Sequence, residues 1–152
     1  MLFRSLHAVF ATDHSDYAER CVGVLTALAP RGIERLTVLT ACPKRLTDDF
    51  DDLAAEMLDA AYGTVQQSAA ARNLQTLERL SGKIGTPQTS FESVVLPGEP
   101  RAVLSDFMKE CGAELLILGA KGHGPIERLA LGSVSFDQAI GPHPWSVLIL
   151  RV

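Results

Sequence analysis

Short apolar runs alternate along the chain with longer stretches of polar and apolar residues at helical spacing. The apolar runs cover residues 6–12, 36–41, 89–96, 114–118 and 146–152. Most are nearly continuous in apolar residues, as expected for strands that are buried on both faces of a sheet. The pattern therefore predicts five strands.

The stretches between these runs predict helices. Residues 17–28 carry apolar side chains at helical spacing, and polar residues 13–16 before them are candidate N-caps. Residues 49–80 are rich in good helix formers. A third helix is expected from Pro100, which suits a first helical turn, and a fourth over residues 133–140.

Strict alternation of strands and helices predicts an α/β fold, a doubly wound parallel sheet with helices on both faces. Residues 1–152 show no internal repeat and no linker, so we expect a single domain. Ligands of such folds lie outside the carboxyl ends of the strands, where the strand order reverses. If the first and fourth strands are adjacent, the loops after Thr12 and Leu118 face each other across that switch point.

Composition and charge narrow the partners. The net charge is −4, and the 14 Lys and Arg residues are scattered singly, which disfavours nucleic acid. No apolar run approaches the roughly 20 residues that span a bilayer, and no secretory signal is evident, so a cytoplasmic protein without membrane contact is expected.

The three cysteines show no C-x-x-C spacing and are expected to be reduced thiols, although Cys42, just past a predicted strand, could be reactive. The acidic run over 48–52 is expected to complement a helix dipole rather than hold a metal.

The strongest chemical signal follows the fourth predicted strand. Gly119 and Gly122 belong to a glycine-bearing loop, and Gly132 and Ser133 open the last helix. Glycines permit positive φ and close approach of a ligand, and a helix start offers unpaired N–H groups to an anion. The hydroxyls of Ser133 and Ser135 could add donors. These features predict an anion site; a tight turn with a serine cap is the alternative. Neither a Walker A loop nor a dinucleotide fingerprint is present.

The glycine spacing resembles that of a known family. Gly119, Gly122, Gly132 and Ser133 match the G-x2-G-x9-G-[ST] pattern of the nucleotide-binding universal stress proteins. Residues 11–13, 96–100 and 145–150 also resemble the family's first strand end, its turn into the third helix and its final strand. The resemblance covers the whole chain and implies the strand order 3-2-1-4-5, with an adenine nucleotide between the ends of strands 1 and 4.

The resemblance also implies individual roles. Asp13 would lie near the adenine or ribose beside the backbone of Ala11 and Thr12, and Ala41 would flank the adenine. Leu118 and Gly119 would touch the ribose. The residues implied around the phosphates are Lys121, Gly122, Gly132, Ser133, Val134 and Ser135.

At some positions this sequence differs from the residues that are frequent in the family. Lys121 stands where Arg or His is frequent, and Ala41 is smaller than the usual Val. His14 replaces a small residue and could narrow the pocket or stack on the base, but a solvent-facing loop histidine is the favoured interpretation. We expect His143 to be structural and Trp145 to serve packing or an interface.

Three functions stay open from the sequence. The first is an ATP-binding regulatory protein of the stress response, with Mg²⁺ or Mn²⁺ bridging the phosphates. The second is a slow ATPase or phosphotransferase with Asp13 as the well-placed carboxylate; no catalytic constellation is evident. The third is an interaction module without ligand. The resemblance and the apolar edge strand at residues 147–152 together imply a homodimer.

Overall fold

Five parallel strands form one sheet in the order β3-β2-β1-β4-β5. The computed structural model describes residues 6–44, 52–121 and 132–152. The strands are β1 (Leu6–Ala11), β2 (Ile33–Cys42), β3 (Ser90–Pro97), β4 (Leu115–Gly119) and β5 (Ser146–Leu150). The predicted doubly wound α/β fold and its strand order are confirmed, and β1 lies at the centre between β2 and β4.

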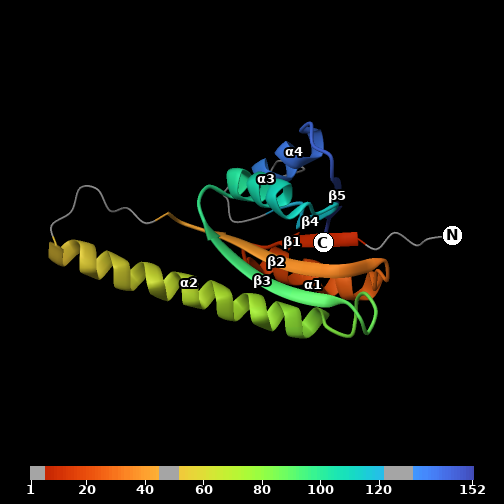
Figure 1. Cartoon of the computed structure of the whole chain (residues 1–152), viewed down its shortest axis with the longest axis horizontal. Coiled ribbons are helices and arrows are strands. Elements are labelled where there is room, and N and C mark those ends of the chain that lie inside the picture. Colours follow the sequence, from red (N-terminus) through yellow and green to blue (C-terminus); the bar gives the residue numbers. More distant parts are fainter. Residues whose placement is uncertain (1–5, 45–51, 122–131) are drawn as a thin grey trace.

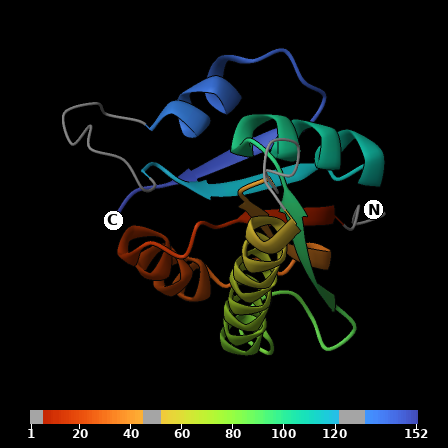
Figure 2. The ribbon, with the colours of Figure 1, turned by 90° about the vertical axis from the view of Figure 1, so that its left-hand side faces the viewer.

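Within the described part of the chain, four helices cover the sheet, two on each face. They are α1 (Asp16–Leu28), α2 (Asp52–Leu80), α3 (Pro100–Cys111) and α4 (Ser133–Ile140). The three layers are visible in Figure 2, where α1 and α2 lie below the sheet and α3 and α4 above it. The first two crossovers fall on one face and the last two on the other, so the chain buries both sides of the sheet.

Each face of the sheet has its own hydrophobic core. Phe10 and Val38 belong to the core between the sheet and helices α1 and α2. Val9, Leu39 and Trp145 belong to the core between the sheet and helix α3. Neighbouring residues of one strand thus enter opposite cores, which follows from the two-residue period of a strand. This explains why β1 is apolar at every position except His7.

The helix starts follow local capping chemistry. The hydroxyl of Ser15 accepts the N–H of Ala18 at 3.2 Å, and the carboxylate of Glu99 accepts the N–H of Ala102 at 3.1 Å. Pro100 occupies the first turn of α3, as predicted. Such caps satisfy amides that have no partner within the helix.

The longest helix extends beyond the sheet. In Figure 1 the first part of α2 projects past the strands, and the buried residues of this helix all lie between Asn73 and Leu80. The predicted start at residue 49 falls outside the described residues. The strand bounds also differ from prediction. The largest differences are that β2 begins three residues earlier, at Ile33, and includes Cys42 in its last position, and that β5 ends at Leu150, two residues before the predicted end. Cys42 is therefore a buried strand residue rather than a loop residue.

Candidate functional site

The switch point lies between the carboxyl ends of β1 and β4. The two strands pair directly, with Phe10 opposite Ile117. Continued by two residues, this register places Thr12 level with Gly119. From there α1 follows β1 on one face, while the chain after β4 leads to α4 on the other face (Figure 2). The two chain segments diverge at this point, which is the arrangement that leaves a ligand crevice.

The start of α4 offers backbone donors at this crevice. Gly132 is its N-cap with φ −68° and ψ 164°, and no side chain caps the helix. The N–H of Gly132 donates to the carbonyl of Ala120 at 2.6 Å, and that of Phe136 donates to Gly132 at 2.9 Å. The three amides between them, of residues 133–135, have no acceptor within the helix. A helix start with free amides and a partial positive charge is a site for an anion.

Ser135 links the start of α4 to the end of β4. Its buried hydroxyl donates to the carbonyl of Gly119 at 2.6 Å, whereas Ser133 is exposed. A hydroxyl has one proton to donate, so in this arrangement the proton of Ser135 is used to hold α4 against the strand. Ser133 is the hydroxyl that faces outward.

Gly119 lies in close contact with α1. A Cβ at this position would lie 3.1 Å from Sγ of Cys21 and 3.2 Å from Cδ1 of Tyr17, both on α1. Neither Gly119 nor Gly132 has a positive φ. Neither glycine therefore uses the positive φ that a glycine permits. The absence of a side chain lets α1 approach the end of β4.

Apolar side chains form a wall beside these donors. Ala11 and Ala41, at the carboxyl ends of β1 and β2, are only partly buried and pack against the core beneath α3. Leu96 and Val134 join the same rim, while Leu118 is buried beneath it. The edge of this core is therefore an apolar surface next to the amides of α4, the combination that small-molecule sites typically offer.

The loop after β1 presents one carboxylate. Asp13 is exposed, and its Oδ1 accepts the N–H of Ser15 at 3.0 Å, a turn in which an Asp side chain folds back on the backbone. Thr12 is buried, and its Oγ1 accepts the N–H of His14 at 3.0 Å. The position of the Asp13 carboxylate is thus set by local hydrogen bonds on both sides of it.

His14 points into the protein and not into solvent, contrary to the favoured prediction. It is 5% exposed and adopts φ 57°. Its Nε2 lies 2.8 Å from Oδ1 of Asn73 on α2, and its backbone carbonyl accepts a bond from Arg72 at 2.6 Å. The left-handed backbone turns the ring under the loop toward α2. There, desolvation lowers the pKa of His14 below the usual 6.5.

Two further residues complete this buried network. Thr40 on β2 lies 2.7 Å from Oδ1 of Asn73 and 3.0 Å from the carbonyl of Thr12. The amide nitrogen of Asn73 donates to the carbonyls of Val38 and Val94. Sequence reasoning missed both Thr40 and Asn73. The signal that could have identified Asn73 is its spacing: it lies four and seven residues before Leu77 and Leu80, on the same buried face of α2.

Lys121 and Gly122 complete the predicted residues. Lys121 is exposed, two residues after the end of β4 at Gly119. Gly122, which the motif places in the phosphate loop, lies outside the described residues. Of the predicted site, the structure brings Ala11, Thr12 and Asp13 to one side of the switch point, and Gly119, Gly132 and Ser133 to the other.

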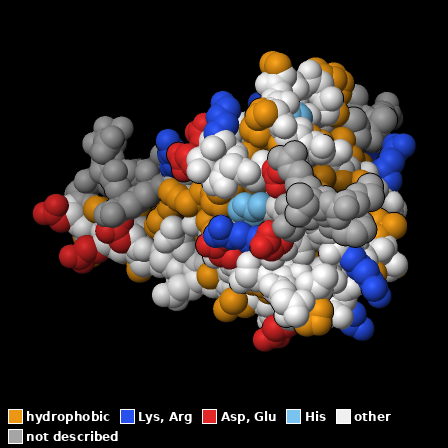
Figure 3. Space-filling view, turned by 45° about the vertical axis from the view of Figure 1, so that its right-hand side comes forward, with side chains coloured by type: hydrophobic (Ala, Val, Ile, Leu, Met, Phe, Trp, Pro, Cys, Tyr) orange, Lys and Arg blue, Asp and Glu red, His pale blue; other side chains and the backbone are white. Residues whose placement is uncertain are grey.

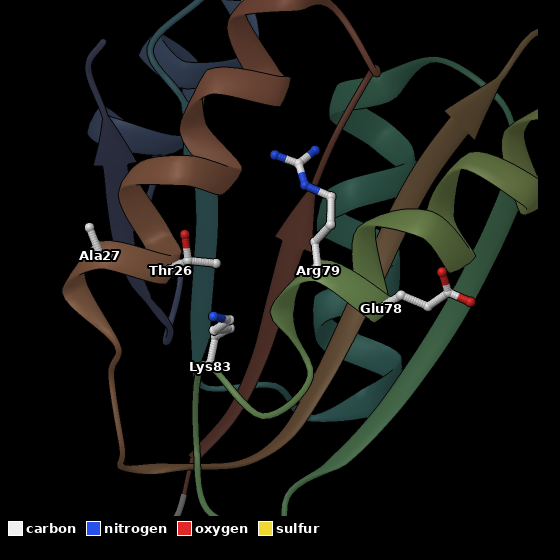
Figure 4. A pocket seen from close by; sticks show the side chains of 5 residues that line it. All are labelled: Thr26, Ala27, Glu78, Arg79 and Lys83. Carbon is white, nitrogen blue, oxygen red and sulfur yellow. The ribbon is translucent and has the colours of Figure 1, made fainter.

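A separate cavity lies at the opposite end of the sheet. It has a volume of about 500 Å³ and is lined by Thr26, Ala27, Glu78, Arg79 and Lys83 (Figure 4). These residues belong to the last turns of α1 and α2 and the turn after α2. Cations there complement the partial negative charge of two helix C-termini, so the lining has a structural explanation. Arg79 is also paired with Glu19.

The surroundings of the Cys21 thiol, beside the switch point, make it unreactive. Cys21 is fully buried, and burial raises the pKa of its thiol to about 11. Because the thiolate is the reactive form, a thiol with this pKa does not act as a nucleophile near neutral pH. Cys21 is a packing residue against Gly119.

Comparison with known proteins decides the family. The universal stress protein family matches residues 6–151. The chain belongs to the universal stress protein family. A universal stress protein of Staphylococcus haemolyticus is 27% identical to this chain over 145 residues. The match covers 94% of this chain and 82% of that protein. The structure of a universal stress protein from Lactobacillus plantarum is similar with a TM-score of 0.69 and 22% identity, covering 97% of this chain and 99% of that one.

Other universal stress proteins of this fold have been solved with adenine nucleotides. One in complex with cAMP has a TM-score of 0.63 at 22% identity, with 97% of this chain and 98% of that chain covered. One from Archaeoglobus fulgidus with dAMP has a TM-score of 0.57 at 19% identity, with 96% and 98% covered. One from Arabidopsis thaliana with AMP has a TM-score of 0.56 at 11% identity, with 96% and 91% covered. In this universal stress protein, no helix of residues 6–44, 52–121 and 132–152 is long and apolar enough to cross a membrane.

Proposed function

We propose that this universal stress protein binds an adenine nucleotide at the switch point between β1 and β4. The observation that carries the proposal is the uncapped start of α4, whose free amides lie beside Gly119 at the end of β4. The apolar rim formed by Ala11 and Ala41 adds a surface suited to a base. Related proteins bound to cAMP, AMP and dAMP support the choice of adenine.

Each part of the nucleotide has a place in this proposal. The adenine lies against Ala11 and Ala41, near Asp13. The ribose lies over Leu118 and Gly119. The phosphates lie at the start of α4, with the Lys121 ammonium as a point charge; the residues assigned to them are Lys121, Gly122, Gly132, Ser133, Val134 and Ser135.

We propose ATP as the nucleotide, with Mg²⁺ or Mn²⁺ bridging its phosphates. The described residues contain no cluster of three or more His, Cys, Asp or Glu that could hold a metal ion. A divalent ion would therefore be held chiefly by phosphate oxygens. The exposed Ser133 hydroxyl fits a position beside them, since hydroxyls commonly accompany the ion in phosphate sites.

The proposed role is regulatory binding in a stress response. Phosphoryl transfer needs a group that orients the attacking water or hydroxyl. Asp13 is the nearest carboxylate to the switch point along the chain, and one of its oxygens already accepts the N–H of Ser15. We therefore assign Asp13 to binding and to the shape of the loop, not to catalysis.

Calorimetric titration with ATP, ADP, AMP and cAMP tests the proposal, and two substitutions of Ser133 dissect it. Ser133→Ala removes only the hydroxyl. Ser133→Pro also removes one free amide donor, at the first helical position where proline is tolerated. The ψ of 164° at Gly132 suits a residue before proline. We expect ATP binding to weaken about tenfold more in Ser133→Pro than in Ser133→Ala, because a charge-assisted hydrogen bond contributes about 1.5 kcal/mol or more.

The outcomes separate clearly. No heat with any of the four nucleotides, from protein shown to be folded by circular dichroism, contradicts the proposal. Equal binding by Ser133→Pro and Ser133→Ala would place the phosphates away from the start of α4. Binding of AMP and cAMP without ATP would support the adenine site and refute ATP as its ligand.

We also propose that the protein is a homodimer joined through residues 147–152. β5 is an edge strand, paired with β4 on one side within the described residues. An open strand edge is a template for another chain. Next to it, α4 exposes the apolar side chains of Phe136 and Ile140, which are 54% and 68% exposed. Light scattering at micromolar concentration tests this proposal, and a monomer mass would refute it.

A further inference from the structure

Two consecutive residues of α2 hold the residue that follows Asp13. The guanidinium of Arg72 donates to the backbone carbonyl of His14 at 2.6 Å. Oδ1 of Asn73 lies 2.8 Å from Nε2 of the His14 ring. The helix therefore contacts both the backbone and the side chain of His14, across 58 and 59 residues of chain. The conformation of the loop after β1 thus depends on where α2 packs.

The backbone of His14 needs support of this kind. Its φ of 57° lies in the left-handed region, which residues with a Cβ rarely adopt. Such a conformation persists where the surrounding structure fixes it. Here Arg72 supplies a donor to the carbonyl and Asn73 an acceptor to the ring. Without them, the chain at His14 is free to return to a negative φ.

A change of φ at His14 would move Asp13 relative to α1. Ser15 is the N-cap of α1, and its amide donates to Oδ1 of Asp13 at 3.0 Å. On the other side of the loop, the N–H of Thr12 donates to the carbonyl of Leu39 in the sheet at 3.0 Å. Both ends of the loop are therefore fixed, and the backbone of His14 determines how the Asp13 carboxylate is presented between them.

We infer that Arg72 is a positioning residue of the nucleotide site, which holds the Asp13 carboxylate in place by fixing the backbone of His14. The inference rests on the proposed function, in which Asp13 lies near the adenine or ribose. A loop that is already held in its binding conformation loses less freedom when the ligand binds, so the affinity is higher. Arg72 is exposed, so its replacement leaves the buried network around Asn73 in place.

The charge of Arg72 has to be separated from its bond to His14. The net charge of the chain is −4, and basic and acidic side chains lie next to one another in the middle of the face shown in Figure 3. At physiological salt, interactions of exposed charges beyond about 8 Å are largely screened. Arg79 is the matched control, because it lies on the same helix and pairs with Glu19 rather than with the carbonyl of His14. Replacing either arginine by methionine removes one positive charge from α2.

Calorimetric titration of ATP and of inorganic tripolyphosphate into the unchanged protein, Arg72→Met and Arg79→Met tests the inference. Tripolyphosphate carries the phosphates of ATP without the adenosine, so it reports on the start of α4 and not on Asp13. We expect ATP to bind about fivefold more weakly to Arg72→Met, a typical size for residues that act without touching the ligand. Tripolyphosphate should bind equally to all three proteins, and Arg79→Met should bind ATP like the unchanged protein.

Amide hydrogen exchange, followed by NMR without nucleotide, reports on the loop itself. The amide of Ser15 donates to Asp13, so it should exchange faster in Arg72→Met than in Arg79→Met. Equal exchange in the two variants would overturn the inference, because the loop would then keep its conformation without Arg72.

The binding results separate this inference from the proposed function. Equal affinity of Arg72→Met and the unchanged protein for ATP would refute the inference and leave the nucleotide site in place. The same loss for tripolyphosphate as for ATP would show that the effect does not arise at Asp13. The same loss in Arg79→Met would assign the effect to charge. No binding of ATP by the folded, unchanged protein would refute the proposed function and the inference together.

Discussion

Nε2 of His14 lies 2.8 Å from Oδ1 of Asn73, and this contact fixes the tautomer of the histidine. The amide nitrogen of Asn73 donates to the carbonyls of Val38 and Val94, so Oδ1 is the atom that faces His14 and can only accept. Nε2 therefore carries the proton. In the neutral ring Nδ1 is a buried lone pair without a hydrogen-bond partner, 3.7 Å from a carboxylate oxygen of Glu19.

Removal of Asn73 should weaken the whole loop after β1. Asn73→Ala leaves the N–H of His14 without its acceptor in a buried site, and it leaves the carbonyls of Val38 and Val94 without the amide donor of Asn73. We expect a loss of about 2–4 kcal/mol in the free energy of unfolding, because buried polar groups without partners are costly. Urea denaturation measures it. Gln75→Ala, an exposed position on the same helix, is the control and should change stability by less than about 0.5 kcal/mol.

Protonation of His14 should destabilise the fold. Its pKa is lowered in the folded protein, chiefly by desolvation, whereas the unfolded chain titrates near 6.5. The unfolded state thus binds the proton more readily. The contribution of His14 is fully present above pH 6.5 and is lost as the pH falls toward the folded pKa.

The slope of stability against pH between 7.5 and 5 checks this prediction. His14→Asn is the suitable variant, because Asn tolerates the left-handed φ of 57°. The pKa of His7 is also lowered by burial, and it stays in both proteins, so the difference between them isolates His14. Equal slopes in the two proteins would contradict the prediction.

A methyl group at Gly119 should strain the contact between β4 and α1. Gly119→Ala places Cβ 3.1 Å from Sγ of Cys21, and the cost of such overpacking is about 1–3 kcal/mol. Combining it with Cys21→Ala should recover part of the loss, so the two changes are coupled in a double-mutant cycle. Additive effects would show that the cost at Gly119 has another origin.

Two other glycines should respond in opposite directions to substitution by alanine. Gly85 has φ 70°, and a Cβ there would lie 2.1 Å from Oγ1 of Thr89, so Gly85→Ala should lower the melting temperature strongly. Gly23 is exposed within α1 with nothing within 4 Å of its Cβ position. Gly23→Ala should stabilise the protein by about 0.5–1 kcal/mol. Thermal melts followed by circular dichroism compare the two variants.

Thiol reactivity should follow burial. The pKa of Cys21 is raised to about 11, and Cys42 is also buried, whereas Cys111 is partly exposed. Iodoacetamide at pH 8 should modify Cys111 first, and Cys21 only after unfolding. Mass spectrometry of digested protein gives the order. Early modification of Cys21 would show that α1 opens readily from the end of β4.

The sequence by itself determined the architecture of this protein. Alternating strands and helices, with strands apolar at nearly every position, are compatible with few arrangements other than a parallel sheet covered on both faces. The spacing of Gly119, Gly132 and Ser133 also pointed to the end of the fourth strand, where the structure has its switch point; binding of a ligand there stays a prediction. These features depend on residues close together in the sequence, so they can be predicted from hydrophobic periodicity and from the residue types that favour turns.

The tertiary structure alone decided how the predicted parts are used. Asn73 reaches His14 across 59 residues, and neither side chain reveals the other in the sequence. Helix α1 packs so closely against Gly119 that a side chain there would be crowded. The hydroxyl of Ser135 donates its proton to the carbonyl of Gly119. The physical cause is common to all three: burial removes water, and each polar or crowded group must then be satisfied by whichever distant residue the fold brings to it.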